Sequence, residues 1–316
     1  MARYLVTGGA GFIGSHLVDR LLARGDEVVV LDNFNDFYDP SLKRRNCAPH
    51  LENRAYRLVE GDLRDARDCH RAFEGGIDQV IHLAAMAGVR PSLKNPGLYV
   101  DVNLKGTANL YDAALEAGCK NIVFASSSSV YGANEKVPFS EEDPVDFPVS
   151  PYAATKKAGE LLSHTYHHIH GMDVACLRFF TVYGPRQRPE MAIHLFSRLI
   201  LEGKPLPVFG DGHSRRDYTY IDDIVDGVVR AMERSSGYRI YNLGESQTIE
   251  LRELVSVLEE ALGKKAVIDW QPDQPGDVPR TWADVTRARE ELGYAPSVDI
   301  REGVRRFVAW LRGDDG

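Results

Sequence analysis

The sequence predicts an α/β protein that combines a doubly wound parallel sheet with a smaller α/β lobe toward its C-terminal end. The first half alternates short apolar segments with amphipathic helical patterns, which is typical of βαβ units in a parallel sheet. Residues 4–7 form such an apolar segment and lead directly into a glycine-rich turn and a helical pattern over residues 15–22. After residue 180, Pro- and Gly-rich turns become frequent, which indicates the second lobe.

The composition is that of an ordinary globular protein and argues against several functional classes. Hydrophobic residues make up 43% and charged residues 27% of the 316-residue chain. The formal net charge of −8 argues against a general nucleic-acid-binding surface, and the one compact basic run, residues 43–45, is expected to be a solvated loop. No apolar segment is long enough to span a membrane, and the start of the chain does not have the pattern of a signal peptide.

The cysteines indicate a reducing compartment. Four of them are scattered along the chain without a C-x-x-C pair: Cys47, Cys69, Cys119 and Cys176. We therefore expect buried free thiols in a cytoplasmic protein, with neither a disulfide framework nor a metal site.

The glycine-rich turn after the first strand predicts a binding site for a pyrophosphate group. Gly8, Gly11 and Gly14 follow the spacing G-x-x-G-x-x-G, which is one residue longer in its first gap than the common dinucleotide fingerprint. Gly8 permits the tight turn, Gly11 lets phosphates approach the backbone, and Gly14 lets the helix pack against the strand. Free N–H groups at the positive end of the helix dipole then bind the anion.

Asp32 ends the second apolar strand, residues 27–31, and selects the kind of dinucleotide. It follows the last glycine at close to the interval of roughly 20 residues at which a carboxylate binds the adenosine ribose. Such a carboxylate accepts from the ribose hydroxyls and repels a 2′-phosphate, which favours NAD over NADP. An aspartate that only caps a turn is the alternative. The turn and the carboxylate together predict a Rossmann-type NAD-binding sheet.

The third strand, residues 56–60, also ends near the expected ligand. Asp62 and Leu63 follow it and are candidates for the adenine edge, although a turn aspartate explains the local sequence nearly as well. A long helix is predicted over residues 99–118, a sixth strand over residues 173–180, and a seventh strand that returns to the main sheet over residues 238–244.

Small and hydroxyl-bearing residues follow the fourth and fifth strands. The fourth strand, residues 79–85, ends in Ala-Ala and leaves room for a ligand, while His82 inside it is interpreted as a hydrogen-bonded core residue. The fifth strand, residues 121–125, opens into the serines at residues 126–129. We expect their hydroxyls to face the ligand crevice, because the carboxyl ends of parallel strands meet there. A flexible serine loop is the alternative.

A helix that begins at Pro151 carries the residues that point to catalysis. Ser150 can cap it, and Tyr152 and Lys156 lie on one helical face because they are four residues apart. A phenol titrates near pH 10, and a neighbouring ammonium together with the positive nicotinamide of NAD lowers that pKa. The pair therefore predicts a general base for an alcohol proton. Tyr-x-x-x-Lys alone is common, and it gains meaning from the glycine turn, Asp32 and the serines.

Histidines gather near the end of the same helix: His164, His167, His168 and His170. Their spacing is compatible with a metal site, but the neighbouring sequence offers neither a cysteine nor an acidic ligand to complete one. We interpret the cluster as a partly exposed helix end.

The second half is interpreted as a lobe that closes over the crevice and supplies cations to an anionic substrate. A loop over residues 185–189 contains two arginines. A short strand is predicted over residues 205–209, with helices over residues 221–234, 249–262 and 301–311. We expect an NAD-binding domain over residues 1–180, its sheet completed by about residues 217–244, and a mainly substrate-binding lobe over residues 181–316.

Taken together, these segments resemble the extended short-chain dehydrogenase/reductase family of nucleotide-sugar epimerases over nearly the whole chain. The matching motifs are GGAGFIG, LDN, HLAA, SSSSVYG, YAATK, RFFTVYGPRQRP, RRDYTYIDD and QPGD. The segments NDFYDPSLK, AGVRPSLKNP, FASSSSVYGAN and RFFTVYGPRQRPEMA are most similar to UDP-glucuronate 4-epimerases. The resemblance implies an isomerase that converts UDP-glucuronate to UDP-galacturonate through a 4-keto sugar, with NAD retained as the cofactor.

The resemblance also implies roles for matching positions. The catalytic residues are Ser127, Tyr152 and Lys156. The NAD contacts are Gly8, Gly11, Phe12, Ile13, Gly14, Asp32, Asn33, Asp62, Leu63, Leu83, Ala84, Ala85 and Asn103, together with Tyr152 and Lys156. The substrate contacts are Ser127, Ser128, Ser129, Tyr152, Thr181, Arg188, Arg216 and Asp277.

Within that set, the substrate residues divide by the group they are expected to bind. Arg188 lies near the sugar carboxylate, with a diphosphate contact or a loop salt bridge as its alternatives, whereas Arg216 and Asp277 hold the diphosphate and the uridine ribose. Gln274 stands where many glucose/galactose epimerases have Arg. One diphosphate contact is therefore expected to be missing or to come from Arg280.

Other functions remain open at this point. They are a 4-epimerase of neutral UDP-sugars (UDP-glucose, UDP-galactose or their N-acetyl forms), a nucleotide-sugar dehydratase or decarboxylase, and a non-catalytic NAD-binding protein. The resemblance further implies a homodimer through a bundle of the helices over residues 99–118 and 152–170. We expect a UDP-sugar as the partner molecule, without nucleic acid or membrane.

Overall fold

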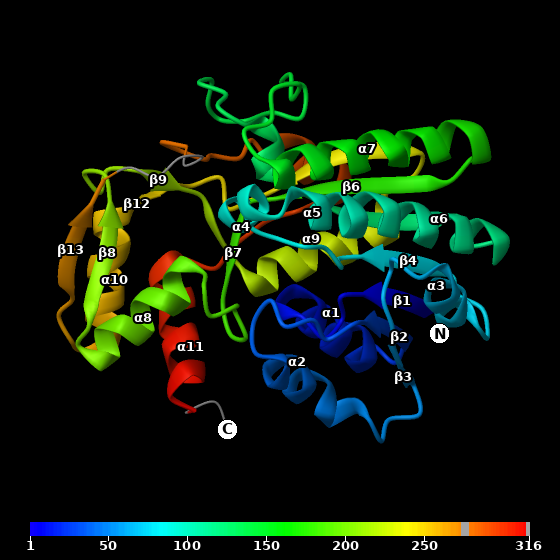
Figure 1. Ribbon diagram of the computed structural model, residues 1–316, viewed down its shortest axis with the longest axis horizontal. Helices are drawn as coiled ribbons and strands as arrows, with labels where there is room; N and C mark the ends of the chain where they lie inside the picture. The colour runs from blue at the N-terminus through cyan, green and yellow to red at the C-terminus, as the bar shows by residue number, and fades with distance from the viewer. Residues whose placement is uncertain (273–277, 314–316) are drawn as a thin grey trace.

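A seven-stranded parallel sheet lies at the centre of the computed structural model, which describes residues 1–272 and 278–313 (Figure 1). The strand order is β11-β6-β5-β4-β1-β2-β3, and each neighbouring pair runs parallel. The bounds are β1 (Arg3–Thr7), β2 (Glu27–Asp32), β3 (Tyr56–Glu60), β4 (Gln79–His82), β5 (Asn121–Ser127), β6 (Asp173–Phe179) and β11 (Tyr238–Leu243). This order confirms the predicted doubly wound fold and the return of the seventh strand to the sheet.

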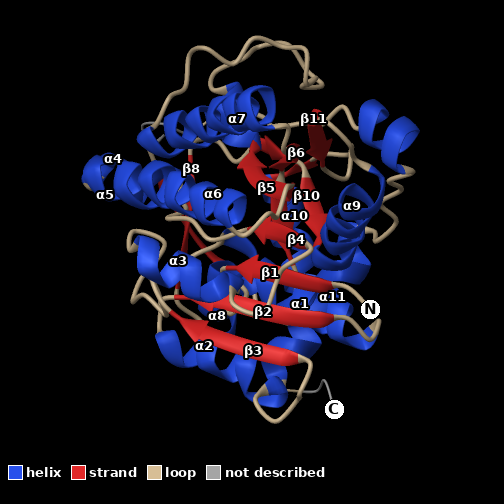
Figure 2. Ribbon diagram, turned by 90° about the vertical axis from the view of Figure 1, so that its right-hand side faces the viewer, coloured by secondary structure: helices blue, strands red, loops and turns tan. Residues whose placement is uncertain are grey.

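Helices cover both faces of the sheet because alternate strand residues point to opposite faces (Figure 2). Val6 packs with Leu17 on the face covered by α1 (Phe12–Ala23) and α9 (Ile221–Arg234). Leu5 packs with Leu110 on the other face, which is covered by α3 (Ala66–Phe73), α6 (Gly106–Glu116) and α7 (Pro151–His170). Both strand faces are therefore apolar, as burial between two helix layers requires.

A smaller lobe lies beside the carboxyl ends of the strands, on the left in Figure 1. It contains three short strand pairs: β7 (Thr181–Tyr183) with β10 (Tyr218–Tyr220), β9 (Arg215–Arg216) with β12 (Ile249–Glu250), and β8 (Pro205–Phe209) with β13 (Val267–Gln271). Its helices are α8 (Ala192–Glu202), α10 (Leu251–Leu262), the π-helical turn η4 (Ala288–Leu292) and α11 (Ile300–Arg312).

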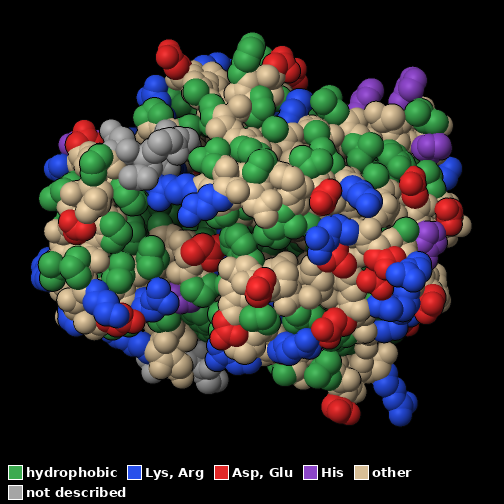
Figure 3. Space-filling model, viewed as in Figure 1, with side chains coloured by type: hydrophobic (Ala, Val, Ile, Leu, Met, Phe, Trp, Pro, Cys, Tyr) green, Lys and Arg blue, Asp and Glu red, His purple; other side chains and the backbone are tan. Residues whose placement is uncertain are grey.

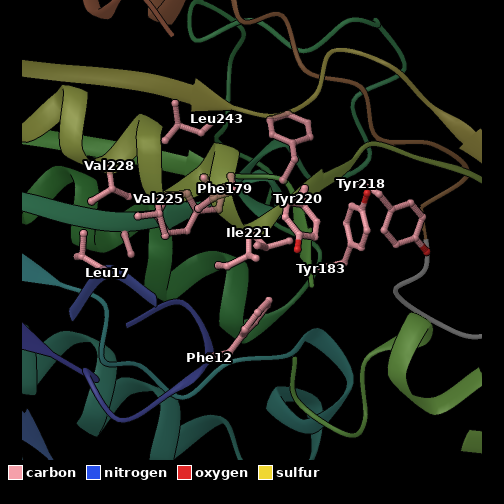
Figure 4. Close-up of a cluster of buried hydrophobic side chains, with 14 of the residues drawn as sticks. Phe12, Leu17, Phe179, Tyr183, Tyr218, Tyr220, Ile221, Val225, Val228 and Leu243 are labelled. Atoms are coloured by element: carbon pink, nitrogen blue, oxygen red, sulfur yellow. The ribbon is translucent and has the colours of Figure 1, made fainter. Parts of the chain in front are cut away.

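One continuous apolar cluster joins this lobe to the sheet (Figure 4). Leu17 of α1, Val225 of α9 and Leu243 of β11 belong to it, and it extends to Tyr183 and Tyr220 of the small lobe. Because buried side chains of both parts interdigitate, the lobe is held at a fixed position beside the strand ends.

Several predicted boundaries were wrong, and the reasons are local. The helix predicted over residues 99–118 is unbroken but runs over residues 96–116, as α5 (Pro96–Val100), a π-helical turn η2 (Asp101–Lys105) and α6. At Gly106 a Cβ would lie 2.9 Å from the Leu63 Cβ, so the helix passes very close to the loop after β3. The fourth strand ends at His82 rather than at residue 85, and residues 249–250 form β12 instead of a helix start.

The basic run predicted as a solvated loop is part of a helix, α2 (Pro40–Cys47). The Asp39 carboxylate caps it by accepting from the Ser41 N–H at 2.9 Å, and Pro40 occupies the first turn. This helix places the Lys43 side chain in the protein interior, where it is 5% exposed. The remaining short elements are η1 (Ala48–His50), α4 (Val89–Lys94) and η3 (Ser128–Tyr131).

A buried ion pair attaches α7 to the sheet. Glu160 of α7 accepts from Arg178 of β6 through two bonds, Nε to Oε1 at 2.8 Å and Nη2 to Oε2 at 3.0 Å. The same carboxylate accepts from the Ser126 hydroxyl at 2.7 Å, and Arg178 Nη1 donates to the Tyr131 hydroxyl at 3.0 Å. The Tyr131 hydroxyl in turn donates to Asn242 of β11 at 2.7 Å. The network thus ties α7 to three neighbouring strands and to the turn after β5.

Replacing Arg178 with Met should lower the free energy of unfolding by about 3–5 kcal/mol, because the buried Glu160 carboxylate loses both guanidinium bonds and keeps only the Lys157 ammonium, at 3.5 Å, as a cationic partner. Side-chain exposure in this pair is 1% for Arg178 and 0% for Glu160. Urea denaturation of the intact chain measures the loss. The matched control is Arg305→Met, which breaks an ion pair whose arginine is 67% exposed and should cost less than about 1 kcal/mol. Equal stability of the two variants would contradict the assigned role of the buried pair.

Candidate active site

A cavity of about 460 Å³ lies at the carboxyl ends of β1, β2, β4, β5 and β6, between the sheet and the small lobe. In Figure 3 the molecular surface is hollowed where the two parts meet, with Lys and Arg side chains on the rim. Most of the predicted site residues line the cavity: Gly8, Gly11, Phe12, Ile13, Gly14, Asp32, Asn33, Asp62, Leu63, Leu83, Ala84, Ala85, Ser127, Ser128, Ser129, Tyr152, Lys156, Thr181 and Arg188. The fold therefore brings residues from seven separate segments to one site.

The glycine turn forms one end of the cavity. The Gly8 N–H donates to Leu31 O at 2.8 Å, and the backbone of Gly8 is left-handed with φ 70°. A Cβ at Gly14 would lie 2.2 Å from Gly8 O, so the start of α1 rests directly on the turn. The first bond of the helix runs from the Ser15 N–H to Gly11 O, which leaves the N–H groups of residues 12–14 before it. This arrangement fits a diphosphate.

Asp32 lies at the next strand end and is almost completely buried. Its carboxylate accepts from the Phe34 N–H at 2.9 Å and from the Ala10 N–H at 3.2 Å. Burial raises the pKa of Asp32, while those two bonds and the charge of Lys43 lower it. Because each carboxylate oxygen has a second lone pair, both can still accept from a ribose diol.

Lys43 is a cavity residue that the sequence reasoning missed. Its ammonium donates to Asn35 O and to Asn35 Oδ1, both at 3.0 Å, and lies 4.9 Å from the centre of the Tyr38 ring. Burial lowers its pKa, and the charge of Asp32 opposes that shift. The Asp39-Pro40 pair was an available signal, since a capping residue followed by Pro in the first turn marks a helix start.

Asp62 and Asn33 line the part of the cavity beyond Asp32. Arg64 donates to both Asp62 oxygens and Asn33 Nδ2 donates to one of them at 2.9 Å, and these bonds lower the pKa of Asp62 to about 2. The carboxylate therefore remains a charged acceptor at neutral pH. Leu63 is buried beside it and supplies apolar surface. Together they fit a flat ring with an amino group.

Ser127, Tyr152 and Lys156 meet at the opposite end of the cavity, at the end of β5 and the first turns of α7. Ser150 caps α7 by accepting from the Ala153 N–H at 3.1 Å. The Lys156 ammonium donates to Ala125 O at 2.7 Å and lies 6.0 Å from the centre of the Tyr152 ring. Burial lowers the pKa of Lys156 to about 8. The hydroxyl, the phenol and the amine thus share one wall.

The acidity of Tyr152 differs from the sequence expectation. Burial raises the pKa of this phenol, while a hydrogen bond with Ser127 and the charge of Arg188 lower it. Lys156 was expected to be the main acidifying cation, but its ammonium is directed at the Ala125 carbonyl in this structure. Arg188 is therefore a cation that acts on the phenol from the small lobe.

Thr181 and Arg188 bring the small lobe into the site. Thr181 begins β7, and its N–H donates to Asp217 O at 3.1 Å. The Arg188 guanidinium lies 5.7 Å from the centre of the Phe37 ring, and its Nε is 2.8 Å from Glu190 Oε1. Ser128 and Ser129 face the same region of the cavity. Two hydroxyls, a threonine and a guanidinium fit a carboxylate.

Two predicted contacts, Asn103 and Arg216, are not among the residues that line the cavity, and a third, Asp277, belongs to a segment that the structure does not describe. Asn103 is buried behind the cavity wall, where its amide donates to Met86 O and to the Thr155 hydroxyl, both at 3.0 Å, and accepts from the Met86 N–H at 2.8 Å. It therefore positions the loop after β4 against α7. Arg216 belongs to β9 outside the cavity lining, and Asp277, like Gln274, lies outside the described residues. Arg280 donates to Glu135 O at 3.3 Å.

His82 is a hydrogen-bonded core residue, as its place inside the fourth strand predicted. His82 is buried, with Nδ1 2.7 Å from the Thr7 hydroxyl and Nε2 2.9 Å from the Thr107 hydroxyl, and burial lowers its pKa to about 3. Among the described residues, no group of three or more His, Cys, Asp or Glu side chains is arranged to hold a metal ion. None of the helices in the described part of the chain has both the length and the apolar character needed to cross a membrane.

Comparison with known proteins finds the same fold and identifies the family. The family described as GDP-mannose 4,6 dehydratase matches residues 5–307. UDP-glucuronate 4-epimerase 2 of Arabidopsis thaliana is 48% identical, over 98% of this chain and 75% of its own length. The UDP-glucuronic acid 4-epimerase of Bacillus cereus, solved with UDP-glucuronic acid and NAD, superposes with a TM-score of 0.93 at 37% identity, covering 98% of this chain and 99% of that one.

The fold itself does not separate reactions. A dTDP-glucose 4,6-dehydratase of Streptomyces venezuelae, solved with NAD, superposes with a TM-score of 0.92 at 36% identity, covering 98% of this chain and 97% of the other. The reaction must therefore be argued from the residues that line the cavity.

Lys156→Met should raise the free energy of unfolding by about 1–3 kcal/mol at pH 7, while it removes a side chain of the catalytic set. The folded pKa of about 8 lies below the ordinary 10.5, so keeping this lysine protonated destabilises the folded state. The gain should be complete below pH 8 and shrink toward pH 10.5, where the unfolded chain also loses the proton. Urea denaturation across that range measures it. Lys265→Met, at a lysine 88% exposed, is the control, and an equal gain there would contradict the assignment.

Proposed function

Because the chain belongs to the GDP-mannose 4,6 dehydratase family of extended short-chain dehydrogenases/reductases, we propose that it is an NAD-dependent UDP-glucuronate 4-epimerase. It interconverts UDP-glucuronate and UDP-galacturonate through a 4-keto sugar. The observation that carries the proposal is one cavity with a diphosphate-binding glycine turn at one end and Tyr152, Ser127 and Lys156 beside Arg188 at the other.

The residues at the glycine end are those that would hold NAD. The free N–H groups at the start of α1 suit its diphosphate, Asp32 its adenosine ribose, and Asp62 and Leu63 its adenine. When bound, this cofactor accepts the hydride from sugar carbon 4 and returns it to the other face. Relatives solved with NAD support this choice of cofactor.

Tyr152 acts as the general base in the oxidative half of the reaction. Its phenolate takes the proton of the 4-hydroxyl, and the phenol gives it back once the keto sugar has turned over in the site. Ser127 orients the hydroxyl, and the charge of Arg188 favours the phenolate. Lys156, with a pKa of about 8, keeps its proton at pH 7, and its ammonium would hold the nicotinamide ribose.

The glucuronate substrate requires protection against loss of carbon dioxide. Its 4-keto form is a β-keto acid, which decarboxylates when the carboxylate bond aligns with the carbonyl π system. Ser128, Ser129 and Thr181 offer hydrogen bonds and Arg188 offers charge to hold the carboxylate away from that alignment. Positions 128 and 129 carry hydroxyls, whereas the family resemblance implies acidic side chains in this loop for related dehydratases and decarboxylases, and this difference favours epimerisation.

Purified protein incubated with UDP-glucuronate and no added NAD should form UDP-galacturonate. NMR of the anomeric protons measures this product. Tyr152→Phe should lower kcat by about 10²–10⁴-fold because it removes the general base. A pentose or a 4-keto-6-deoxy product would establish a decarboxylase or dehydratase instead. Unchanged turnover in Tyr152→Phe would show that Tyr152 is not the general base.

Arg188→Leu should raise KM for UDP-glucuronate by about 10–100-fold, since one charge-assisted contact to the carboxylate is lost. KM for UDP-glucose, which has no carboxylate, should change far less, whereas kcat should fall with both sugars because the charge that favours the Tyr152 phenolate is lost. Steady-state kinetics with each sugar measure these changes in kcat and KM. Faster turnover of UDP-glucose than of UDP-glucuronate by the unaltered protein would make it a neutral-sugar epimerase.

We further propose a homodimer that forms through α4, α5 and α7. These helices lie side by side, and large apolar side chains on them are exposed: Leu93 by 48%, Val100 by 47% and Leu161 by 57%. Light scattering should give twice the chain mass, and Leu161→Glu should shift the protein to monomer without unfolding it. A monomer in the unaltered protein would contradict the proposal.

We also propose a cytoplasmic location for the protein, because the four cysteines are buried free thiols.

A further inference from the structure

The loop that carries Arg188 is attached to both halves of the protein. On the side of the small lobe, the Gln187 side chain is 1% exposed, donates to Val182 O at 3.1 Å and accepts from the His194 N–H at 3.2 Å. The Gln187 carbonyl also accepts from His194 Nδ1 at 2.6 Å. These bonds fix the loop to β7 and α8.

On the other side, two contacts reach α1, the helix whose first turn forms the diphosphate end of the cavity. Arg186 Nη1 donates to Asp19 Oδ2 at 2.7 Å, and His16 Nε2 lies 2.9 Å from Pro185 O. Since a carbonyl oxygen only accepts, His16 Nε2 carries the proton. The other Asp19 oxygen is 2.6 Å from His50 Nε2, which orients the carboxylate toward the loop. We call Asp19, His16, Pro185 and Arg186 the α1 clasp.

The backbone at Arg186 is a second, independent observation. Its φ of 62° lies in the left-handed region, which is unfavourable for a residue with a Cβ and normally favours glycine. A residue is held in such a conformation only when its surroundings determine it, and here the side chain is held by Asp19. The strained residue is two positions before Arg188, so its conformation helps to set the path of the backbone that carries Arg188.

We propose that the α1 clasp is a specificity device: Arg186 and Asp19 are positioning residues that set the distance between the cofactor helix and the arginine that binds the sugar carboxylate. The proposal rests on the function proposed above. It goes further because it assigns the choice between acidic and neutral sugars partly to contacts outside the cavity. A shift of the loop away from α1 moves Arg188 relative to a sugar held at Tyr152, and small displacements of a positioning group weaken catalysis strongly.

The experiment compares Asp19→Asn, Arg186→Ala, Arg186→Gly and Arg186→Lys with Glu233→Gln as the matched control. Glu233→Gln breaks another ion pair of α1, at 2.9 Å to Arg24, on the side of α9. For each variant, kcat and KM are measured with UDP-glucuronate and with UDP-glucose, and calorimetry gives the affinities for both sugars. Retained NAD is quantified by its absorbance after denaturation.

Asp19→Asn, Arg186→Ala and Arg186→Gly should raise KM for UDP-glucuronate on the order of tenfold. The same variants should leave KM for UDP-glucose and the amount of retained NAD within about twofold of the unaltered protein. Arg186→Lys should keep most of the preference for UDP-glucuronate, because lysine still offers a donor to Asp19. Arg186→Gly separates the two observations, since glycine relieves the backbone but makes no ion pair.

If Arg186→Gly keeps the same ratio of KM values for the two sugars as the unaltered protein, only the backbone conformation matters. That result would overturn the role of the ion pair. An equal loss on both sugars, or the same loss in Glu233→Gln, would reduce the clasp to a stabilising contact and overturn the proposal. If the unaltered protein does not epimerise UDP-glucuronate, the proposed function fails. The ratio of the two calorimetric affinities still tests the clasp, because that ratio does not depend on turnover.

Discussion

The ion pair between Glu160 and Arg178 is the interaction on which the site depends most. Both side chains are removed from water, so each would be very unfavourable without the other. The pair fixes α7 against β6, and the hydroxyls of Ser126 and Tyr131 extend it to β5 and the turn that follows. Tyr152 and Lys156 lie one to two helical turns before Glu160 on α7, and Ser127 directly follows Ser126. The positions of Ser127, Tyr152 and Lys156 are therefore set by a polar network of which only Ser126 lines the cavity.

In the cavity, burial of the titratable side chains and the charges placed beside them have opposite effects on their pKa values. Burial disfavours charge at Tyr152, Lys156, Asp32 and Lys43, and it is the largest influence on the pKa of each of them. Opposing charges are placed so that the site remains usable: Lys43 acts on Asp32, and Arg188 acts on Tyr152. Arg188 thus has two proposed tasks, since the cation that would bind the sugar carboxylate also favours the phenolate. A substrate carboxylate would offset part of that charge and tune the base as it binds.

The sequence was sufficient for the parallel sheet because its buried strands are short apolar runs that end in glycine, aspartate or serine. It was also sufficient to assemble most of the cavity wall, since residues at strand ends converge in this topology. It did not reveal that Lys43 is buried, because three adjacent basic residues resemble a solvated surface until Asp39 is recognised as a helix cap. It did not place Asn103 behind the wall, because the π-helical turn that carries it has no clear local pattern. The partner of Lys156 depends on the Ala125 carbonyl, a backbone group that side-chain patterns do not report.

The two backbone bonds accepted by Asp32 have a consequence for redesign of coenzyme preference. Exchanging this residue for a small neutral one, the usual route toward a phosphorylated ribose, would leave the amides of Ala10 and Phe34 facing the interior without an acceptor. The loop that shapes the adenosine end would then lose its fixed conformation at the moment the repulsive charge is removed. An engineered switch would need a second substitution that supplies new acceptors to those amides, so coenzyme choice and loop architecture cannot be altered independently in this protein.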